Sequence, residues 1–211
     1  MKRKILIGCA KSGVMAAAWE KVGWEATECD ILPGTHIRHI QDNVLNHLND
    51  GWDAAIFHPP CTYLSHAGAR WLYPNHILNQ DRYSKGLAAK EFFMMLWSSE
   101  VPFIAIENPQ PQKVYQLPKE SQIIQPYQFG HHVQKKTYLW LKGFPLLQHT
   151  KLVEPQFYID GKGIRHTILN NWNAEKASRT FEGIAEAMAS QWGNLTPELL
   201  LSLPSASLQE T

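Results

Sequence analysis

Residues 56–65 read IFHPPCTYLS, and this stretch decides how the rest of the chain is interpreted. The apolar run at 54–57 predicts a buried strand, and the strand has to stop at Pro59 and Pro60 because proline has no N–H to donate to a sheet ladder. Cys61 follows directly. In open α/β sheets, ligands bind in the crevice beyond the carboxyl ends of the strands. The stretch therefore predicts a parallel sheet with Cys61 at its ligand-binding edge.

Two interpretations of Cys61 follow from this position. It is a nucleophile at a binding edge, or it is a small apolar core residue, because free cysteine is among the most buried residue types. A second stretch, FIAIENP at 103–109, favours the nucleophile. It is another apolar strand that ends in polar residues, Glu107 and Asn108. Two strands of one sheet that both end in polar residues are expected to bring them to one cleft.

These stretches resemble the motifs of a known family. The Pro-Cys pair that contains Cys61, with Ser65 four residues later, is similar to the Pro-Cys motif of cytosine-C5 DNA methyltransferases. Glu107-Asn108 is similar to their Glu-Asn-Val motif, and most of residues 4–193 resemble the short methyltransferase-like proteins of phages and prophages. The resemblance implies an α/β fold of the class I, Rossmann-like type of S-adenosylmethionine-dependent methyltransferases, a mostly parallel sheet with helices on both faces.

The resemblance also implies a mechanism. Cys61 would add to C6 of cytosine, and Glu107 would stabilise the charge that this addition creates, at N3 of the base. Asn108 would order the Cys61 loop by hydrogen bonding. Ser65 and Arg70 belong to a long loop that, in the family, closes over a base taken out of its stack, so both are expected to bind substrate. A solvated arginine is the alternative for Arg70.

Residues 4–30 have the pattern of a β-α-β unit, with strands at 4–9 and 25–30 around a helix at 14–21. An acid, Asp30, ends the second strand. This layout binds the ribose of adenosine in open α/β sheets.

In the family, the turn after the first strand reads Phe-x-Gly-x-Gly, and the matching positions here are Cys9, Lys11 and Gly13. An ordinary strand-turn-helix is the alternative. The residues that the resemblance implies for S-adenosylmethionine are Cys9, Lys11, Ser12, Gly13, Asp30 at the ribose, Asp42 at the adenine, and Pro59.

Lysines precede an alternating pattern that ends at Lys142 and predicts a strand. The family has a Gln-x-Arg-x-Arg motif at this point. Gln134 and Lys136 match its first two positions, and Tyr138 stands at the last. The resemblance implies a catalytic role for Lys136 and substrate contacts for Gln134 and Lys135. A strand edge protected by lysines is the alternative.

The other patterns are weaker. A short amphipathic helix is expected at 44–48, a longer one at 81–98, and a last one from a Thr180 cap to Trp192. Irregular structure is expected at 65–80, 109–126 and 149–173.

Composition limits the class of protein. With 211 residues, 44% hydrophobic and 18% charged, the chain is expected to form one globular domain over 1–211. Three cysteines without a Cys-x-x-Cys pair argue against a disulfide framework or a zinc site, so no metal is expected. No run is long enough to span a membrane, and a cytoplasmic location in a bacterium or a phage-infected host is expected.

The partner expected from the resemblance is DNA, double- or single-stranded. The net charge is only +1, so the contact surface has to be local, and basic residues outnumber acids between residues 131 and 180. Residues 145–178 are too few for the family's large target-recognition domain. They are interpreted as a reduced target-recognition insertion, and a partner protein as an additional source of sequence specificity.

Three functions stay open at this point. The first is methylation of cytosine C5 in DNA through Cys61. The second is a catalytically inactive or cofactor-altered relative that binds nucleic acid or nucleotide, and Lys11 in the cofactor turn supports it. The third is a thiol hydrolase in which His58 or His66 is the base for Cys61 and Glu107 has no use.

Overall fold

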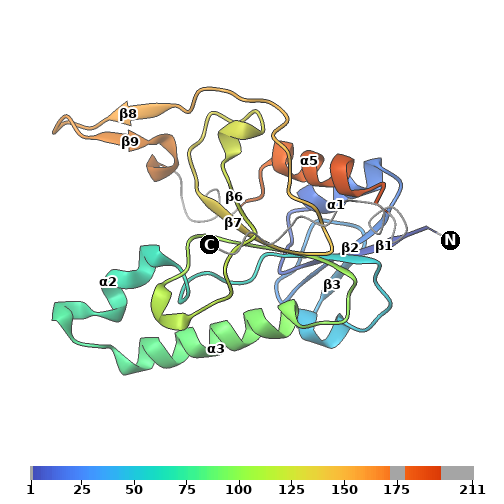
Figure 1. Ribbon diagram of the computed structural model, residues 1–211, viewed down its shortest axis with the longest axis horizontal. Coiled ribbons are helices and arrows are strands. Elements are labelled where there is room, and N and C mark those ends of the chain that lie inside the picture. Colours follow the sequence, from blue (N-terminus) through green and yellow to red (C-terminus); the bar gives the residue numbers. More distant parts are fainter. Residues whose placement is uncertain (1, 172–178, 196–211) are drawn as a thin grey trace, which may run out of the picture.

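The computed structural model describes residues 2–171 and 179–195, and a seven-stranded sheet forms its centre (Figure 1). The strand order is β3-β2-β1-β4-β5-β7-β6, in which β1 to β5 run parallel and β7 is antiparallel to both of its neighbours. The predicted fold class, a Rossmann-like α/β fold with a mostly parallel sheet and helices on both faces, is confirmed. The strands are β1 (Lys4–Gly8), β2 (Glu25–Asp30), β3 (His39–Gln41), β4 (Ala54–Phe57), β5 (Phe103–Asn108), β6 (Gln122–Ile124) and β7 (Thr137–Lys142).

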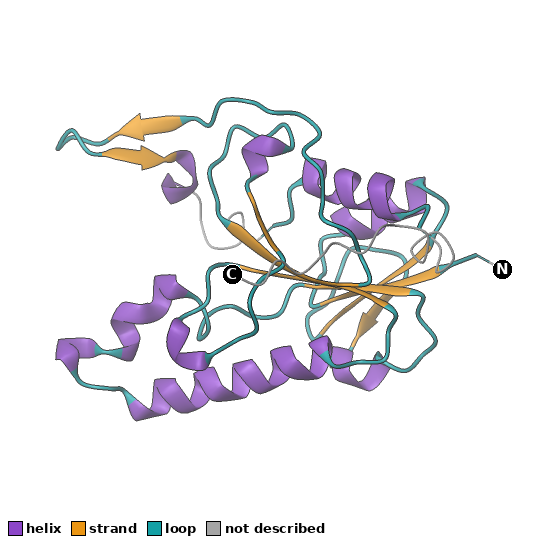
Figure 2. Cartoon of the chain, viewed as in Figure 1, coloured by secondary structure: helices purple, strands orange, loops and turns teal. Residues whose placement is uncertain are grey.

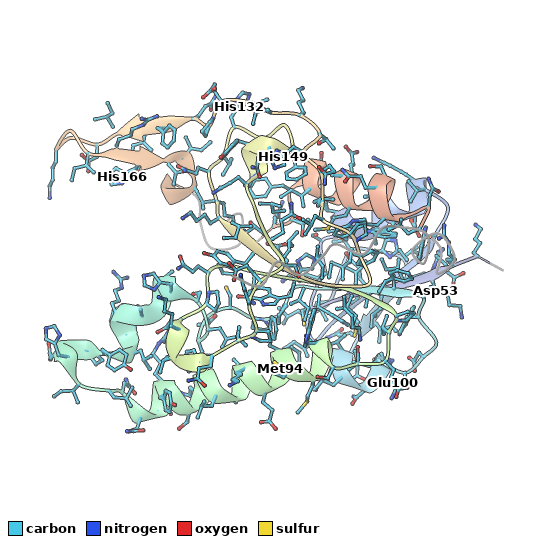
Figure 3. All side chains as sticks on the ribbon, in the orientation of Figure 1. Asp53, Met94, Glu100, His132, His149 and His166 are labelled. Atoms are coloured by element: carbon cyan, nitrogen blue, oxygen red, sulfur yellow. The ribbon has the colours of Figure 1, made fainter. Side chains whose placement is uncertain are left out.

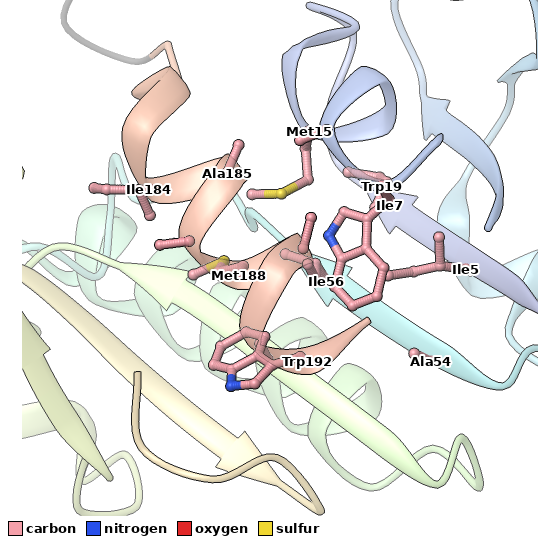
Figure 4. Close-up of a cluster of buried hydrophobic side chains, with 14 of the residues drawn as sticks. Ile5, Ile7, Met15, Trp19, Ala54, Ile56, Ile184, Ala185, Met188 and Trp192 are labelled. Atoms are coloured by element: carbon pink, nitrogen blue, oxygen red, sulfur yellow. The ribbon is translucent and has the colours of Figure 1, made fainter. Parts of the chain in front are cut away.

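Different helices cover the two faces of the sheet (Figure 2). α1 (Val14–Lys21) and α5 (Glu182–Trp192) pack on one face, and α3 (Gln80–Trp97) packs on the other. Figure 4 shows the α1–α5 layer, in which Trp19 and Trp192 are fully buried. The central strands read as continuous apolar runs because parallel strands between two helical layers are buried on both faces.

The register of the three central strands positions the site. Gly8 at the end of β1 pairs with Phe57 at the end of β4, and Phe57 pairs with Ile106 of β5. The chain therefore leaves all three strands at one edge of the sheet, where His58 and Glu107 stand next along their strands. β4 and β5 are parallel neighbours, as the two polar strand ends had predicted.

Three segments expected to be irregular contain regular structure instead. β6 forms because Ile123 pairs with Tyr138 of β7, and a separate two-stranded sheet, β8–β9, forms a hairpin. Strands of three residues are too short for an alternating pattern to reveal them, and what forms them is pairing with a partner strand. The missed elements are η2 (His66–Gly68), α2 (Ala69–Leu72), η3 (Pro74–His76), η4 (Lys113–Tyr115), β6, β8 (Phe157–Ile159), β9 (Arg165–Thr167) and η6 (Ile168–Asn171).

Two helix predictions need correction at their ends. The helix expected at 44–48 is a 3-10 helix, η1 (Val44–His47), and the side chain of Asn43 caps it by accepting the N–H of Leu45. The last helix has Phe181 at its N-cap and no side-chain capping bond, so Thr180 is not the cap. Another 3-10 turn, η5 (Pro126–Gln128), precedes β7.

Gly86 generates a stability prediction, because it lies buried in α3 where Tyr115 packs on the helix. A Cβ at Gly86 would stand 2.1 Å from the Cζ and Oη atoms of Tyr115. Alanine normally stabilises a helix interior over glycine by about 1 kcal/mol, so a reversed sign is diagnostic. We expect Gly86→Ala to lower the free energy of unfolding by about 1–3 kcal/mol in urea denaturation.

The control is Ser84→Ala, at an exposed position of the same helix, which should change that free energy by less than about 0.5 kcal/mol. A stabilised Gly86→Ala variant would show that Tyr115 does not pack against this glycine.

Candidate active site

A cavity of about 790 Å³ lies at the carboxyl edge of the sheet, within the size range of about 300–1,000 Å³ that is usual for ligand pockets. The turn after β1, the end of β2, the loop after β4, the end of β5, the segment before β7 and the residues before α5 all contribute to it. Its lining residues are Cys9, Ala10, Lys11, Ser12, Val14, Asp30, Pro33, Thr35, His58, Pro59, Pro60, Cys61, Glu107, Pro109, Lys135, Arg179 and Thr180.

The Cys61 loop is anchored at its base. The side-chain amide of Asn108, which is buried at the end of β5, donates to the carbonyl of Pro59 at 3.1 Å. The guanidinium of Arg82 in α3 donates to the carbonyl of Thr62 at 2.7 Å. These bonds lie on both sides of Cys61, so the thiol is presented on a braced segment, and Asn108 makes the kind of bond that the resemblance implied.

Glu107 and His58 form a close pair inside the cavity. Nδ1 of His58 lies 2.9 Å from Oε2 of Glu107, and the two side chains are only 15% and 17% exposed. Burial alone would raise the pKa of Glu107, but the hydrogen bond and charge of His58, together with the charge of Lys135, outweigh it and lower that pKa. Glu107 is therefore an ionised carboxylate when the cavity is empty of substrate.

The Cys61 thiol has the opposite balance. Burial raises its pKa, the positive charge of Lys135 lowers it, and the negative charge of Glu107 raises it again. The net direction is upward, so a thiol rather than a thiolate is the resting form at neutral pH. Lys135 is the cation whose charge lowers the pKa of Cys61 and so favours its thiolate.

The turn after β1 forms the other end of the cavity. Cys9 has a positive φ of 57° and Gly13 one of 73°, so the turn uses the left-handed region twice, once without glycine. The carbonyl of Cys29 accepts the N–H of Cys9 at 2.7 Å. Glu28, fully buried on β2, accepts the N–H of Gly13 at 2.9 Å.

Asp30 lies beside this turn, where an acid can accept hydrogen bonds from ribose hydroxyls. One of its oxygens, Oδ1, accepts the N–H of Leu32 at 2.8 Å, which orients the carboxylate at the end of β2. The Lys11 carbonyl accepts the N–H of Thr35 at 3.1 Å, so the loop after β2 is tied to the turn. Backbone turn, acid and cavity volume together fit an adenosine-bearing ligand.

The structure brings together Cys61, Glu107, Lys135, Cys9, Lys11, Ser12, Asp30 and Pro59 in the lining of this cavity. Gly13 borders an adjoining cavity of about 420 Å³ between α1 and α5.

Five residues expected at the site lie elsewhere. Lys136 and Gln134 are exposed and outside the cavity lining, because successive residues before β7 face opposite ways and Lys135 takes the inward position. Asp42 binds Asn46 and His47 with its carboxylate and does not line the cavity.

Arg70 and Ser65 lie on the segment that follows Cys61. The guanidinium of Arg70 stands over the exposed ring of Trp71, with its carbon 4.8 Å from the ring centre. Ser65 is buried, and its carbonyl accepts the side-chain amide of Gln112 at 3.1 Å. Neither residue lines the cavity of Cys61.

Sequence reasoning missed Glu28, Arg179 and the pairing of His58. A charged residue in the middle of a buried strand was the available signal for Glu28, because an unpaired buried carboxylate is costly. No local signal marked His58 as a partner of Glu107, since the two residues meet only through the pairing of β4 with β5.

Two further features concern the described part of the chain. No helix there is both long enough and apolar enough to cross a membrane. Within residues 2–171 and 179–195, no three His, Cys, Asp or Glu side chains are grouped so that they could hold a metal ion.

Comparisons with known proteins give distant structural similarity. No protein-family model matches the chain, and no curated protein matches it by sequence. Similar solved structures are a candidate DNA modification methyltransferase encoded within an E. coli prophage (13% identity, TM-score 0.42), a methyltransferase of Entamoeba histolytica (13%, 0.44) and a mutant DNMT2 of Spodoptera frugiperda (15%, 0.36). In the same order, the matches cover 66%, 76% and 74% of this chain. This chain spans 46%, 61% and 55% of the length of those three chains. TM-scores below 0.5 do not establish a relationship, and the fold is assigned from the strand order of the central sheet.

The charges around Cys61 generate a prediction for its alkylation by iodoacetamide, read by mass spectrometry across pH. We expect the alkylation rate of Cys61 to increase at a higher pH than that of an ordinary cysteine, because its pKa is raised. Lys135→Gln should shift this increase to still higher pH, because it removes a nearby cation that lowers the pKa of Cys61. Burial raises the pKa of Cys9 to about 12 and that of Cys29 to about 11, so the alkylation of these thiols should also require high pH.

Lys136→Gln is the matched control, since it removes the same charge from the neighbouring outward-facing position. If Lys136→Gln shifted the pH dependence of Cys61 alkylation and Lys135→Gln did not, Lys136 would be the lysine that faces the cavity.

Proposed function

We propose that this protein transfers a methyl group from S-adenosylmethionine to C5 of cytosine in DNA, through a covalent bond between Cys61 and C6. The observation that carries the proposal is a single cavity lined by Cys61 and Glu107 at one end and by Asp30 and the 9–12 turn at the other. A nucleophile, a carboxyl group and an adenosine site are the parts that this reaction needs in one place.

The first step is the addition of the Cys61 thiolate to C6. The new S–C6 bond displaces the C5–C6 π electrons into the ring, where N3 and O2 carry the resulting charge, and C5 becomes nucleophilic. Lys135 favours the thiolate that this step requires. Elimination of Cys61 at the end, with loss of the C5 proton, restores the double bond.

Glu107 faces the charge that the first step creates. A proton presented to N3 by the carboxyl group stabilises the adduct, and the rigid end of β5 fixes where that proton is presented. Asn108 joins β5 to the Cys61 loop through the Pro59 carbonyl, so the nucleophile and the carboxyl group keep a constant separation.

The cofactor is placed at the β1–β2 end of the cavity. S-adenosylmethionine supplies an electrophilic methyl group there. Asp30 would bind the ribose hydroxyls, the turn from Cys9 to Ser12 would border the methionine part, and Lys11 would attract its carboxylate. Lys11 in the lining also favours the second candidate, a relative with an altered cofactor, and binding measurements separate the two.

Two projections beside the cavity support DNA as the substrate. The first, which we call the α2 arm, comprises residues 65–80 and follows Cys61 directly. The second is the β8–β9 hairpin, and both project from the same end of the molecule, the left in Figure 1. No Asp or Glu occurs from His58 to Gln80, so nothing in that sequence repels a phosphate backbone.

Each projection presents an arginine next to an aromatic ring. On the α2 arm it is Arg70 over Trp71, and on the hairpin the guanidinium carbon of Arg165 lies 3.8 Å from the ring centre of Phe157. His166, labelled in Figure 3, stacks on Tyr158 beside them. We propose the hairpin as the reduced target-recognition element of segment 145–178, of which residues 172–178 lie outside the described part of the chain.

The thiol-hydrolase alternative has less support. Its base would have to bond the thiol, but Nδ1 of His58 is occupied by Glu107, and Nε2 of His58 has no hydrogen-bond partner among the described residues. His66 is exposed and does not line the cavity.

Cofactor binding gives the first test of the proposal. In titration calorimetry the protein should bind S-adenosylmethionine, and Asp30→Ala should weaken binding by about 1–3 kcal/mol because a carboxylate that bonds the ribose is lost. Glu100→Ala is the control, an exposed acid at the opposite edge of the sheet, before β5 (Figure 3). Equal affinity of Asp30→Ala and the parent would remove Asp30 from the site, and no binding by the parent would favour the cofactor-altered alternative.

Covalent trapping tests the chemistry. A DNA strand that carries 5-fluorocytosine should become attached to the protein in the presence of S-adenosylmethionine, because fluorine cannot leave C5 as a proton does. Cys61→Ser should abolish the adduct, since a serine hydroxyl is a far weaker nucleophile. Glu107→Gln should slow its formation by about 100-fold or more, because general acid catalysis typically contributes that much.

The adduct is read as a protein–DNA band on a denaturing gel. An adduct that survives Cys61→Ser would identify another nucleophile. No adduct on any DNA alongside clear cofactor binding would contradict DNA cytosine methylation.

A further inference from the structure

We propose that His58 supplies the proton that Glu107 delivers to N3 of the target cytosine. The inference rests on the proposed function, and the geometry of one partly buried pair carries it. His58 follows β4 directly and Glu107 lies near the end of β5, so the pairing of these strands sets the two side chains face to face.

The direction of the hydrogen bond is determined by chemistry. An ionised carboxylate can only accept, so the contact of 2.9 Å requires a proton on Nδ1 of His58. The backbone N–H of His58 donates to the carbonyl of Gly8 at 3.0 Å, which fixes the residue between β1 and β5. Nε2 has no partner among the described residues, and the ring lines the cavity.

The reaction needs this arrangement because Glu107 alone is ionised and carries no proton for N3. Its pKa lies below the ordinary value for glutamate, so at neutral pH the carboxylate has no proton to give. N3 of cytosine nevertheless has to receive one as charge develops on the ring. A protonated imidazole behind the carboxylate resolves this conflict, since the pair His58–Glu107 holds a proton that neither the solvent nor Cys61 has to provide.

The proton balance is as follows. Sγ of Cys61 forms a bond to C6, and the ring electrons shift toward N3. The Nδ1 proton of His58 moves to the Glu107 carboxylate and passes from it to N3, which leaves His58 neutral and Glu107 ionised. When Cys61 is expelled and C5 has lost its own proton to solvent, the N3 proton passes back through Glu107 to Nδ1 of His58 and the pair is restored.

Other charges face the pair from three directions. Lys135, before β7, acts on Glu107, and Cys61 lies on the loop after β4. Glu28, on β2, is a second carboxylate that feels the charge of His58. The charge of Glu107 is therefore coupled to Lys135 as well as to His58.

Two substitutions separate proton supply from simple orientation. His58→Asn places an amide N–H near the position of Nδ1, so it keeps a donor to Glu107 but has no proton to transfer. His58→Leu removes the donor as well. His149→Asn, at an exposed histidine labelled in Figure 3, is the matched control.

The first measurement is the rate of adduct formation on 5-fluorocytosine DNA against pH. We expect His58→Asn to lower the maximal rate about tenfold or more and to move the falling limb to lower pH, because Glu107 alone must then hold the proton. Cofactor affinity should stay unchanged in both His58 variants. A His58→Asn enzyme with the rate and pH profile of the parent would overturn proton supply and leave His58 as an orienting residue.

The second measurement does not depend on activity. In carbon-13 NMR titrations of the Glu107 carboxyl group, the pKa should rise in His58→Leu, where burial is no longer offset, and rise less in His58→Asn. An unchanged pKa in His58→Leu would overturn the pairing itself. If the parent forms no adduct but the shifts are seen, the proposed function and the catalytic role fail together, while the pair stands.

Discussion

Parallel pairing of β1, β4 and β5 is the constraint on which the site depends. Because the three strands are in register, the chain leaves each of them at one edge, and the groups that follow share one cavity. The close packing has its own requirement at Gly8, where a Cβ would lie 2.5 Å from the ring of Phe57. A side chain at Gly8 would therefore displace β4 and, with it, the segment that carries Cys61.

The cavity brings together ionisable groups whose pKa values are shifted in opposite directions. A partly buried thiol whose pKa is raised and a partly buried carboxylate whose pKa is lowered stand near one lysine. Burial of such groups costs free energy unless each has a partner. Here His58 compensates Glu107, and Lys135 only partly compensates Cys61, so Cys61 rests as a thiol.

The turn after β1 is also held by bonds from a neighbouring strand. It lacks most of the glycines that usually let a backbone approach a cofactor, yet Cys9 adopts the left-handed conformation without one. Bonds from β2 hold the turn in place, through the Cys29 carbonyl and the Glu28 carboxylate. Hydrogen bonds from β2 thus hold a conformation that glycine would adopt without strain.

The amino-acid sequence by itself determined the central strands of the sheet and the meeting of two of their ends. Apolar runs bounded by proline, glycine or charge predict β2, β4 and α1 at the residues where they occur. Since the carboxyl ends of parallel strands share an edge, Cys61 and Glu107 could be expected in one cleft before any coordinates were known. These features depend on local composition and on the general geometry of parallel sheets.

Only the tertiary structure decided which lysine faces the cavity, what Glu107 binds and where the hairpin forms. Lys135 and Lys136 are chemically alike and differ by one position, and the pairing of the strand that follows them determines which one turns inward. His58 and Glu107 are 49 residues apart and meet only because β4 pairs with β5. Contacts of this kind depend on strand register, and register is set by the packing of the whole sheet rather than by any local pattern.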